Sequence, residues 1–279
     1  MRLLLTGADG FTGININSIA SRLGIQVLNL KSNLLDNENL KKEVASLDFT
    51  HILHLAGIAQ STLEDYSKYY NGNVEATKNL LLSIKNNKKL KKIIIASSAT
   101  VYGRNSGMLD EVAKTEPINY YAKSKLEMEK LILNDFSHLP IIITRPFNYT
   151  GKHQTNSFVI PKIVQHFKDN KSEIILGNIE VFREFNDVRY VAEIYLKLLS
   201  IPESNFIINI CTGKSISIKQ VLDTISEITK KTINFRINNN LIRKNDPLLL
   251  CGNPNLLISL TGVNYTYDIS DTLKWMLYD

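Results

Sequence analysis

The sequence predicts an α/β protein built around a doubly wound parallel sheet. Short apolar segments alternate with helical segments through roughly the first 150 residues. The apolar segments show no alternation of polar and apolar residues, as expected of strands that are covered on both faces. A glycine-rich turn separates the first apolar segment from the first helical one. Right-handed crossovers between such strands place helices on both faces of one sheet.

Each element in the first half follows from composition and spacing. Residues 93–95 are three consecutive isoleucines, which favour a buried strand, and apolar residues recur at three- and four-residue steps in 73–84, which favours a helix. We expect strands at 1–6, 26–30, 51–56, 93–97 and 141–144, and helices at 14–23, 40–47, 73–84 and 121–133.

The alternation is less regular after residue 151. The tail contains Asp246-Pro247 and Asn253-Pro254, so we expect it to be rich in loops. The same patterns predict helices at 158–167, 189–199 and 218–229, and strands at 173–176 and 206–211. Since no low-complexity linker divides the chain, the second part is expected to pack directly on the first.

Composition excludes several classes of protein. The 279 residues are 44% hydrophobic and 22% charged, which is an ordinary globular mixture, and no apolar run approaches the roughly 18 residues of a membrane span. The net charge of +6 is scattered apart from 88–92, so it does not indicate a nucleic-acid partner. The apolar run at residues 1–5 is too short for the hydrophobic region of a signal peptide, and Cys211 and Cys251 have no metal-ligand spacing. These features predict a reduced, cytoplasmic protein without a metal.

A glycine-rich turn follows the first strand and opens the first helix. Gly7, Gly10 and Gly13 have the spacing G-x-x-G-x-x-G. Glycines permit positive φ and allow a pyrophosphate to approach the backbone, and the helix N-terminus supplies unpaired N–H groups. The turn therefore predicts a Rossmann-type dinucleotide site.

The end of the second strand favours NADP over NAD. An acidic residue at this position would accept the 2′-hydroxyl of NAD, whereas a basic residue accommodates the 2′-phosphate of NADP. Lys31 and Ser32 stand here, and no carboxylate does. NADPH is therefore the expected cofactor, with NAD as the alternative.

Three side chains form a candidate catalytic group. Ser98 follows the fourth strand, and Tyr121 and Lys125 lie four residues apart at the start of a long helix. The ammonium of Lys125 is expected to lower the pKa of Tyr121 towards neutrality, so that the phenol can act as an acid or base. Ser98 is placed to donate a hydrogen bond to a carbonyl oxygen.

Together these motifs resemble the extended short-chain dehydrogenase/reductases that modify nucleotide sugars, also called the NAD-dependent epimerase/dehydratase family. The resemblance implies that Ser98, Tyr121 and Lys125 form the catalytic triad. It implies a cofactor domain at 1–151 with a return segment at about 184–212, and a small α/β substrate-binding domain at 152–183 and 213–279. The cofactor-binding residues that it implies are Gly7, Asp9, Gly10, Phe11, Thr12, Gly13, Lys31, Ser32, Leu55, Ala56, Gly57, Ala96, Tyr121, Lys125 and Pro146.

The segment after Ser98 separates the reactions of this family. Its dehydratases resemble one another in having Asp-Glu directly after the catalytic residue, whereas this chain has Ala99 and Thr100, which cannot supply that acid/base chemistry. The sequence Ser-Ala-Thr-Val-Tyr-Gly at 98–103 also resembles 4-epimerases, which keep NAD tightly bound. Lys31 favours exchangeable NADPH and therefore a net reductase.

The segment 144–151 resembles the substrate-side loop of this family, and 177–189 and 209–213 are closest to GDP-6-deoxy-4-keto-mannose reductases and to their relative GDP-mannose 4,6-dehydratase. Expected substrate-binding residues are Ser98, Thr100, Tyr121, Asn148, Arg183 and Arg243. The two arginines are candidates for the diphosphate because a guanidinium matches phosphate oxygens in a fork. Asp187 and Arg189 are expected to form a structural pair.

The resulting hypothesis is an NADPH-dependent reductase of the C4 keto group of a nucleoside-diphosphate-4-keto-6-deoxyhexose. A 4-epimerase is the first alternative, and a non-catalytic NADP-binding module is the second. The resemblance also implies surface-polysaccharide (O-antigen) synthesis in the cytoplasm, and a homodimer formed through the helices at 73–84 and 121–133.

Overall fold

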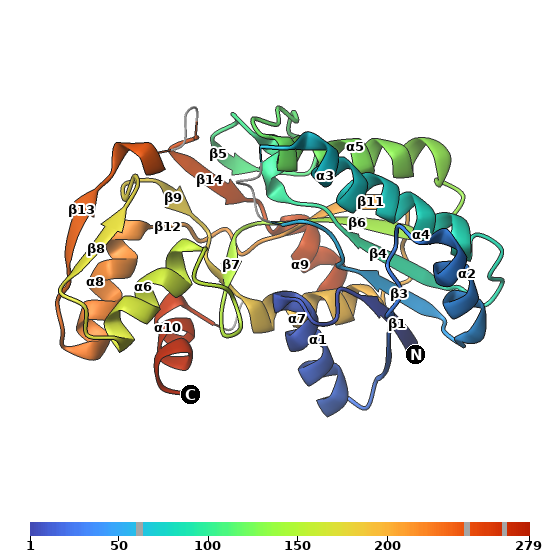
Figure 1. Ribbon diagram of the computed structural model, residues 1–279, viewed down its shortest axis with the longest axis horizontal. Coiled ribbons are helices and arrows are strands. Elements are labelled where there is room, and N and C mark those ends of the chain that lie inside the picture. The colour runs from blue at the N-terminus through green and yellow to red at the C-terminus, as the bar shows by residue number, and fades with distance from the viewer. Residues whose placement is uncertain (60–63, 243–245, 264–266) are drawn as a thin grey trace.

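The central feature of the protein is a six-stranded parallel sheet (Figure 1). The computed structural model describes residues 1–59, 64–242, 246–263 and 267–279. Every pair of neighbouring strands in the sheet runs parallel, which confirms the predicted fold class. In spatial order the strands are β11 (Phe206–Ile210), β6 (Ile141–Pro146), β4 (Lys92–Ala96), β3 (His51–His54), β1 (Arg2–Thr6) and β2 (Gln26–Asn29).

Helices cover both faces of this sheet because its strands are apolar on both sides. Leu3 and Leu5 are buried in one hydrophobic cluster, and Leu4 between them is buried in the other. One face carries α1 (Phe11–Arg22), α7 (Val188–Leu198) and α9 (Asn255–Thr261), and the opposite face carries α2 (Asn37–Ser46), α4 (Ala76–Ile84) and α5 (Tyr120–Asp135). Burial of both faces is the reason that continuous apolar runs form these strands.

A smaller α/β part lies beside the carboxyl ends of these strands (Figure 1). Its core joins three helices, α6 (Val159–Lys168), α8 (Ile218–Thr229) and α10 (Ile269–Tyr278). Its strands are β8 (Glu173–Leu176) with β13 (Asn234–Ile237), and β12 (Ile216–Ser217), β9 (Phe182–Arg183), β14 (Leu249–Gly252) and β5 (Gly107–Leu109). Among the described residues, no helix is both long and apolar enough to cross a bilayer.

The prediction of a loop-rich tail was wrong. Pro254 is the N-cap of α9, and Asp268 and Asp271 form a capping box that starts α10. A proline is tolerated at the start of a helix, where an N–H would lack a partner in any case. The tail also contains β14 and a short 3₁₀ turn, Asn239–Leu241.

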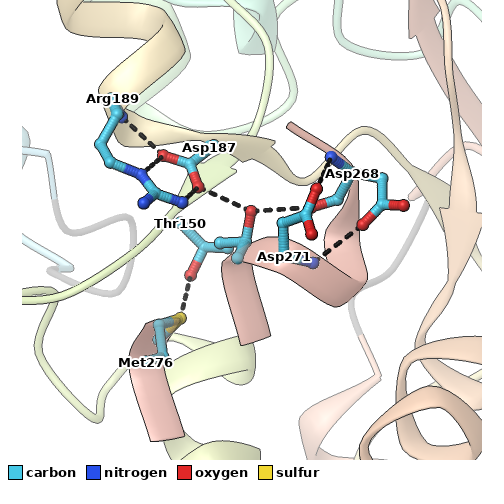
Figure 2. Close-up of polar contacts among 7 residues, drawn as sticks. Thr150, Asp187, Arg189, Asp268, Asp271 and Met276 are labelled. Atoms are coloured by element: carbon cyan, nitrogen blue, oxygen red, sulfur yellow. Dashed lines mark hydrogen bonds and ion pairs between the residues drawn. The ribbon is translucent and has the colours of Figure 1, made fainter. Parts of the chain in front are cut away.

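A polar network fastens the C-terminal helix α10 to the start of α7 (Figure 2). Asp187 caps α7 and accepts two hydrogen bonds from the Arg189 guanidinium, at 2.9 and 2.6 Å. The hydroxyl of Thr272 in α10 donates to the same carboxylate at 2.8 Å. The Arg189 guanidinium lies 4.3 Å from the ring centroid of Tyr267 and 4.1 Å from that of Trp275. The expected pairing of Asp187 with Arg189 is confirmed.

Candidate active site

A cavity of about 350 Å³ opens at the carboxyl ends of β1, β3, β4 and β6. Ligands of open parallel sheets bind at this edge. The sequence-predicted residues that line it are Gly7, Gly10, Phe11, Thr12, Gly13, Leu55, Gly57, Ala96, Ser98, Thr100, Tyr121, Lys125, Pro146 and Asn148. Residues from 7 to 148 therefore converge on one site, as the motifs predicted.

Two glycines of the turn allow its backbone to pack closely against neighbouring backbone. Gly7 has a φ of +71°, and a β-carbon added there would lie 2.8 Å from the Ala56 nitrogen. A β-carbon on Gly13 would lie 2.2 Å from the Gly7 oxygen. Gly10 is the N-cap of α1, and in the described structure no side chain caps the first turn of that helix. Its free N–H groups and the bare turn fit a dinucleotide pyrophosphate.

Ser98 is held as a hydrogen-bond donor towards the cavity. It caps a short 3₁₀ turn, Ala99–Tyr102, and its Oγ accepts hydrogen bonds from the Thr100 N–H at 3.2 Å and the Thr100 hydroxyl at 2.9 Å. With both donors on its oxygen, the hydroxyl hydrogen of Ser98 is left to donate elsewhere. A carbonyl oxygen in the cavity would receive it. Thr100 therefore orients Ser98, a role that its place in the motif alone did not indicate.

The charge state of Tyr121 differs from the sequence-based expectation. Burial raises the pKa of Tyr121 to about 12, and hydrogen bonding with Ser98 only partly opposes this shift. Lys125 does not lower the pKa of Tyr121. Its ammonium instead donates a hydrogen bond to the Ala96 carbonyl at 2.7 Å. The ring of Tyr121 packs beside that of Tyr69, with the ring centroids 6.3 Å apart. Tyr121 is thus a neutral phenol at pH 7, the form that can give up a proton.

Lys125 is buried at the same site. Burial lowers the pKa of its ammonium to about 8, although the nearby carboxylate of Glu129 opposes the shift. Lys125 is therefore mostly charged at pH 7, and its charge faces the end of β4. A cofactor ribose in the cavity could accept its hydrogen bonds.

The sequence model described as "NAD dependent epimerase/dehydratase family" matches residues 3–211. The chain belongs to this family.

Two curated relatives and one solved structure are similar to this chain over 96% or more of its length. GDP-6-deoxy-D-talose 4-dehydrogenase of Aggregatibacter actinomycetemcomitans is 30% identical, over 96% of this chain and 93% of its own. GDP-6-deoxy-D-mannose reductase of Pseudomonas aeruginosa is 27% identical, over 100% of this chain and 96% of its own. The structure of RMD from Pseudomonas aeruginosa complexed with NADPH is 25% identical, with a TM-score of 0.89 over 99% of this chain and 98% of its own. The protein is thus an NAD(P)-dependent enzyme of the short-chain dehydrogenase/reductase type.

Behind the triad lies a buried ion pair that the sequence motifs did not reveal. Arg145 of β6 makes two hydrogen bonds to Glu129 of α5, at 3.0 and 2.7 Å, and the Ser97 hydroxyl donates to the same carboxylate at 2.5 Å. Glu129 lies four residues after Lys125 on one helical face, and Arg145 is a charge within an apolar strand. The positions of Glu129 and Arg145 are visible in the sequence, but only the fold shows that the two side chains pair with each other.

Tyr149 connects the substrate side of the cavity with the glycine turn. Its hydroxyl and that of Thr12 are 2.8 Å apart, and its ring stacks on Phe11 with centroids 5.6 Å apart. Gln154 donates to the Tyr149 carbonyl and also lines the cavity. Other lining residues, outside the set predicted as site residues, are Ile58, Ala59, Ser97, Asn119, Phe147, Tyr149, Gln154 and Phe158.

Some predicted residues lie away from this cavity. Asp9, Lys31, Ser32, Ala56 and Arg183 are not among the described residues that line it. The buried guanidinium of Arg183 pairs with Asp246 at 2.9 Å. It also donates to the carbonyl oxygens of Pro247 and Leu248, at 2.8 and 3.4 Å.

Arg243, the second candidate for the diphosphate, lies outside the described residues. Its role therefore stays a prediction from the sequence.

A buried histidine supports the same edge of the sheet. The ring nitrogens of His54, at the end of β3, lie 2.7 Å from the hydroxyl of Thr6 and 2.9 Å from that of Thr77. Burial lowers the pKa of His54 to about 3, and the charge of Lys125 adds to the shift. His54 is thus neutral when the protein is folded at pH 7.

Acidification is expected to destabilise the protein through His54. The unfolded chain binds a proton at this histidine below about pH 6.5, and the folded chain does not until about pH 3, so stability falls as the pH falls through this window. The free energy of unfolding should decrease by about 2 kcal/mol between about pH 7.5 and about pH 5 from this group alone. Urea unfolding at the two pH values measures it. His54→Gln should lose most of this pH dependence, whereas His138→Gln, which changes an exposed histidine, should keep it. If the free energy of unfolding changed equally with pH in both variants, His54 would not be the source of the dependence.

Proposed function

We propose that this protein is a nucleotide-sugar 4-ketoreductase. It would use NADPH to reduce the C4 keto group of a nucleoside-diphosphate-4-keto-6-deoxyhexose, linked to GDP or dTDP. The observation that carries the proposal is the pairing of a neutral buried phenol, Tyr121, with a hydroxyl held as a donor, Ser98, above the glycine turn. A relative named as a 4-dehydrogenase of a GDP-linked 6-deoxyhexose supports redox chemistry at this carbon.

Ser98, Tyr121 and Lys125 each have a separate role in the proposed reaction. NADPH, when bound, supplies the hydride that C4 receives. Ser98 donates a hydrogen bond to the C4 carbonyl oxygen and so fixes its position beside Tyr121. Tyr121 transfers its phenolic proton to that oxygen as negative charge develops on it, so that the ketone becomes an alcohol. Lys125, which lines the cavity, would donate hydrogen bonds to the nicotinamide ribose.

One feature of the cavity suits a ketone that is already formed. Thr100 stands where the dehydratases carry a carboxylate, so the site has no acid to expel water from the sugar at this position. Asn148 lines the cavity and is a candidate for the sugar diphosphate. For Arg183 to bind the diphosphate as well, its ion pair with Asp246 would have to open.

The decisive experiment offers the protein a panel of GDP- and dTDP-linked 4-keto-6-deoxyhexoses, first with NADPH and then with NADH. Consumption of NADPH at 340 nm and a 4-hydroxy product identified by NMR are expected with at least one member of the panel. The proposal would be overturned if the protein reduced none of the 4-keto sugars but interconverted two 4-hydroxy sugars.

A 4-epimerase is the second candidate, favoured by the sequence at 98–103. It would retain NAD through purification and would show no net consumption of NADPH. A third candidate, a non-catalytic NADP-binding module, would bind the dinucleotide but turn over neither class of sugar. The complete set of Ser98, Tyr121 and Lys125 in one cavity argues against it.

We also propose a homodimer formed through α4 and α5. Partly exposed apolar side chains on these helices are available for contact with a second copy, namely Leu82, Tyr120 and Leu133. Analytical ultracentrifugation tests this, and a monomer at micromolar concentration would overturn it. The setting that we propose is cytoplasmic deoxysugar synthesis for surface polysaccharide, and a gene deletion that leaves surface polysaccharide unchanged would contradict it.

A further inference from the structure

Helix α2 brings a carboxylate to the end of β2, where the sequence shows only Lys31 and Ser32. One oxygen of Glu43 accepts the Lys31 N–H at 2.9 Å, and the other accepts the Ser32 N–H at 2.6 Å. Burial alone would raise the pKa of Glu43, but hydrogen bonds from the Ser32 hydroxyl and from these two N–H groups hold it below its ordinary value. Glu43 is therefore a carboxylate at pH 7, bound at three donors.

These donors form an anion site that the protein itself fills. Two consecutive backbone N–H groups with a neighbouring hydroxyl and ammonium are a common arrangement for binding phosphate oxygens. In a Rossmann-type sheet, the end of β2 is also where the ribose of the adenosine is recognised. A 2′-phosphate placed there would need the Lys31 and Ser32 donors that Glu43 already occupies.

The two dinucleotides differ in what Glu43 does to them. The phosphate of NADP competes with the carboxylate for the same donors, and the two negative charges repel. NAD has only a hydroxyl at this position, and a hydroxyl can donate a hydrogen bond to a carboxylate. Glu43 thus opposes NADP while Lys31 attracts it.

We propose that Glu43 sets the preference between NADP and NAD, by occupying the donors that a 2′-phosphate requires. The proposal rests on the dinucleotide site proposed above. Glu43 makes the preference for NADPH weaker than Lys31 alone would make it. The proposal also assigns a specificity role to a residue of α2, remote in sequence from the glycine turn and from the end of β2.

The test measures binding rather than turnover. Wild type, Glu43→Gln and Glu38→Gln are titrated with NADP⁺ and with NAD⁺ by isothermal calorimetry, in a buffer without phosphate. Glu38 is a matched control because it lies on the same helix, is exposed, and pairs only with Lys42 among the ion pairs described. Each variant removes one carboxylate, so a general effect of net charge would appear in both.

In Glu43→Gln we expect NADP⁺ affinity to rise about tenfold or more relative to NAD⁺, because the amide has only one oxygen to accept these hydrogen bonds and no negative charge to repel the phosphate. Glu38→Gln should leave the ratio within about twofold of wild type. NAD⁺ binding by Glu43→Gln shows that the variant is folded. An unchanged ratio in Glu43→Gln, or an equal rise in both variants, would overturn the role of Glu43 while leaving the proposed function intact. Wild-type protein that binds neither dinucleotide would overturn both.

Discussion

Replacing Tyr121 by phenylalanine is expected to lower kcat by about 10²- to 10⁴-fold, the contribution typical of a positioned proton donor. The phenol is neutral and buried, so it is the group that can protonate the sugar oxygen. Phenylalanine keeps the ring and its packing beside Tyr69 but has no proton to give. Dinucleotide affinity should change little, since the glycine turn and Lys125 are unaltered.

The neighbouring tyrosine provides a matched control. Tyr120 lies on the same helix, is 47% exposed, and packs against Tyr66 rather than the cavity. Turnover of the 4-keto sugar and calorimetric binding of NADPH are measured for both variants. Tyr120→Phe should retain wild-type kcat. Comparable kcat values for Tyr121→Phe and Tyr120→Phe would show that Tyr121 is not the proton donor.

Replacing Glu129 by glutamine is expected to lower the free energy of unfolding by about 3–5 kcal/mol, because it leaves a buried guanidinium without its counter-charge. The side chains of Arg145 and Glu129 are only 5% and 2% exposed. The carboxylate also accepts a hydrogen bond from Ser97, next to Ser98, the serine proposed to be catalytic. Stability and the geometry of the site should therefore decline together.

Urea unfolding of four variants tests this expectation: Glu38→Gln, Glu129→Gln, Arg145→Gln and the double variant of the last two. Glu38→Gln breaks an exposed ion pair and should change stability by no more than about 0.5 kcal/mol. The double variant Glu129→Gln with Arg145→Gln should cost less than the sum of its single changes, since no unpaired charge remains. A loss below about 1 kcal/mol for Glu129→Gln would contradict the buried-pair argument.

The sequence predicted those parts of the protein that depend on local pattern. Glycine spacing and the helical pairing of Tyr121 with Lys125 located the cavity, because each of these signals spans only a few residues. The strands were found because both of their faces are buried, as the division of Leu3, Leu4 and Leu5 between two clusters shows.

What the sequence did not predict depends on partners distant in the chain. Glu43 reaches Lys31 and Ser32 only when α2 folds back on β2, and the partner of Arg145 comes from a helix 16 residues away. Burial, which decides the pKa of Tyr121, is a property of the assembled fold rather than of the motif. In the tail, prolines that favour loops in the sequence begin or precede regular elements of the fold, as Pro254 does.

The parallel order of the six-stranded sheet has a consequence for how the chain reaches this state. Parallel neighbours cannot be joined by a tight hairpin, so every pairing in the sheet closes a long loop before it gains contacts. The edge strand β11 pairs with β6, which ends about 60 residues earlier in the chain. Such a topology folds slowly and exposes unpaired strand edges until its last strand docks. The yield of refolded protein after dilution from denaturant should accordingly be highest at low protein concentration. Under these conditions, intermediates in which β6 is not yet paired with β11 rarely meet one another.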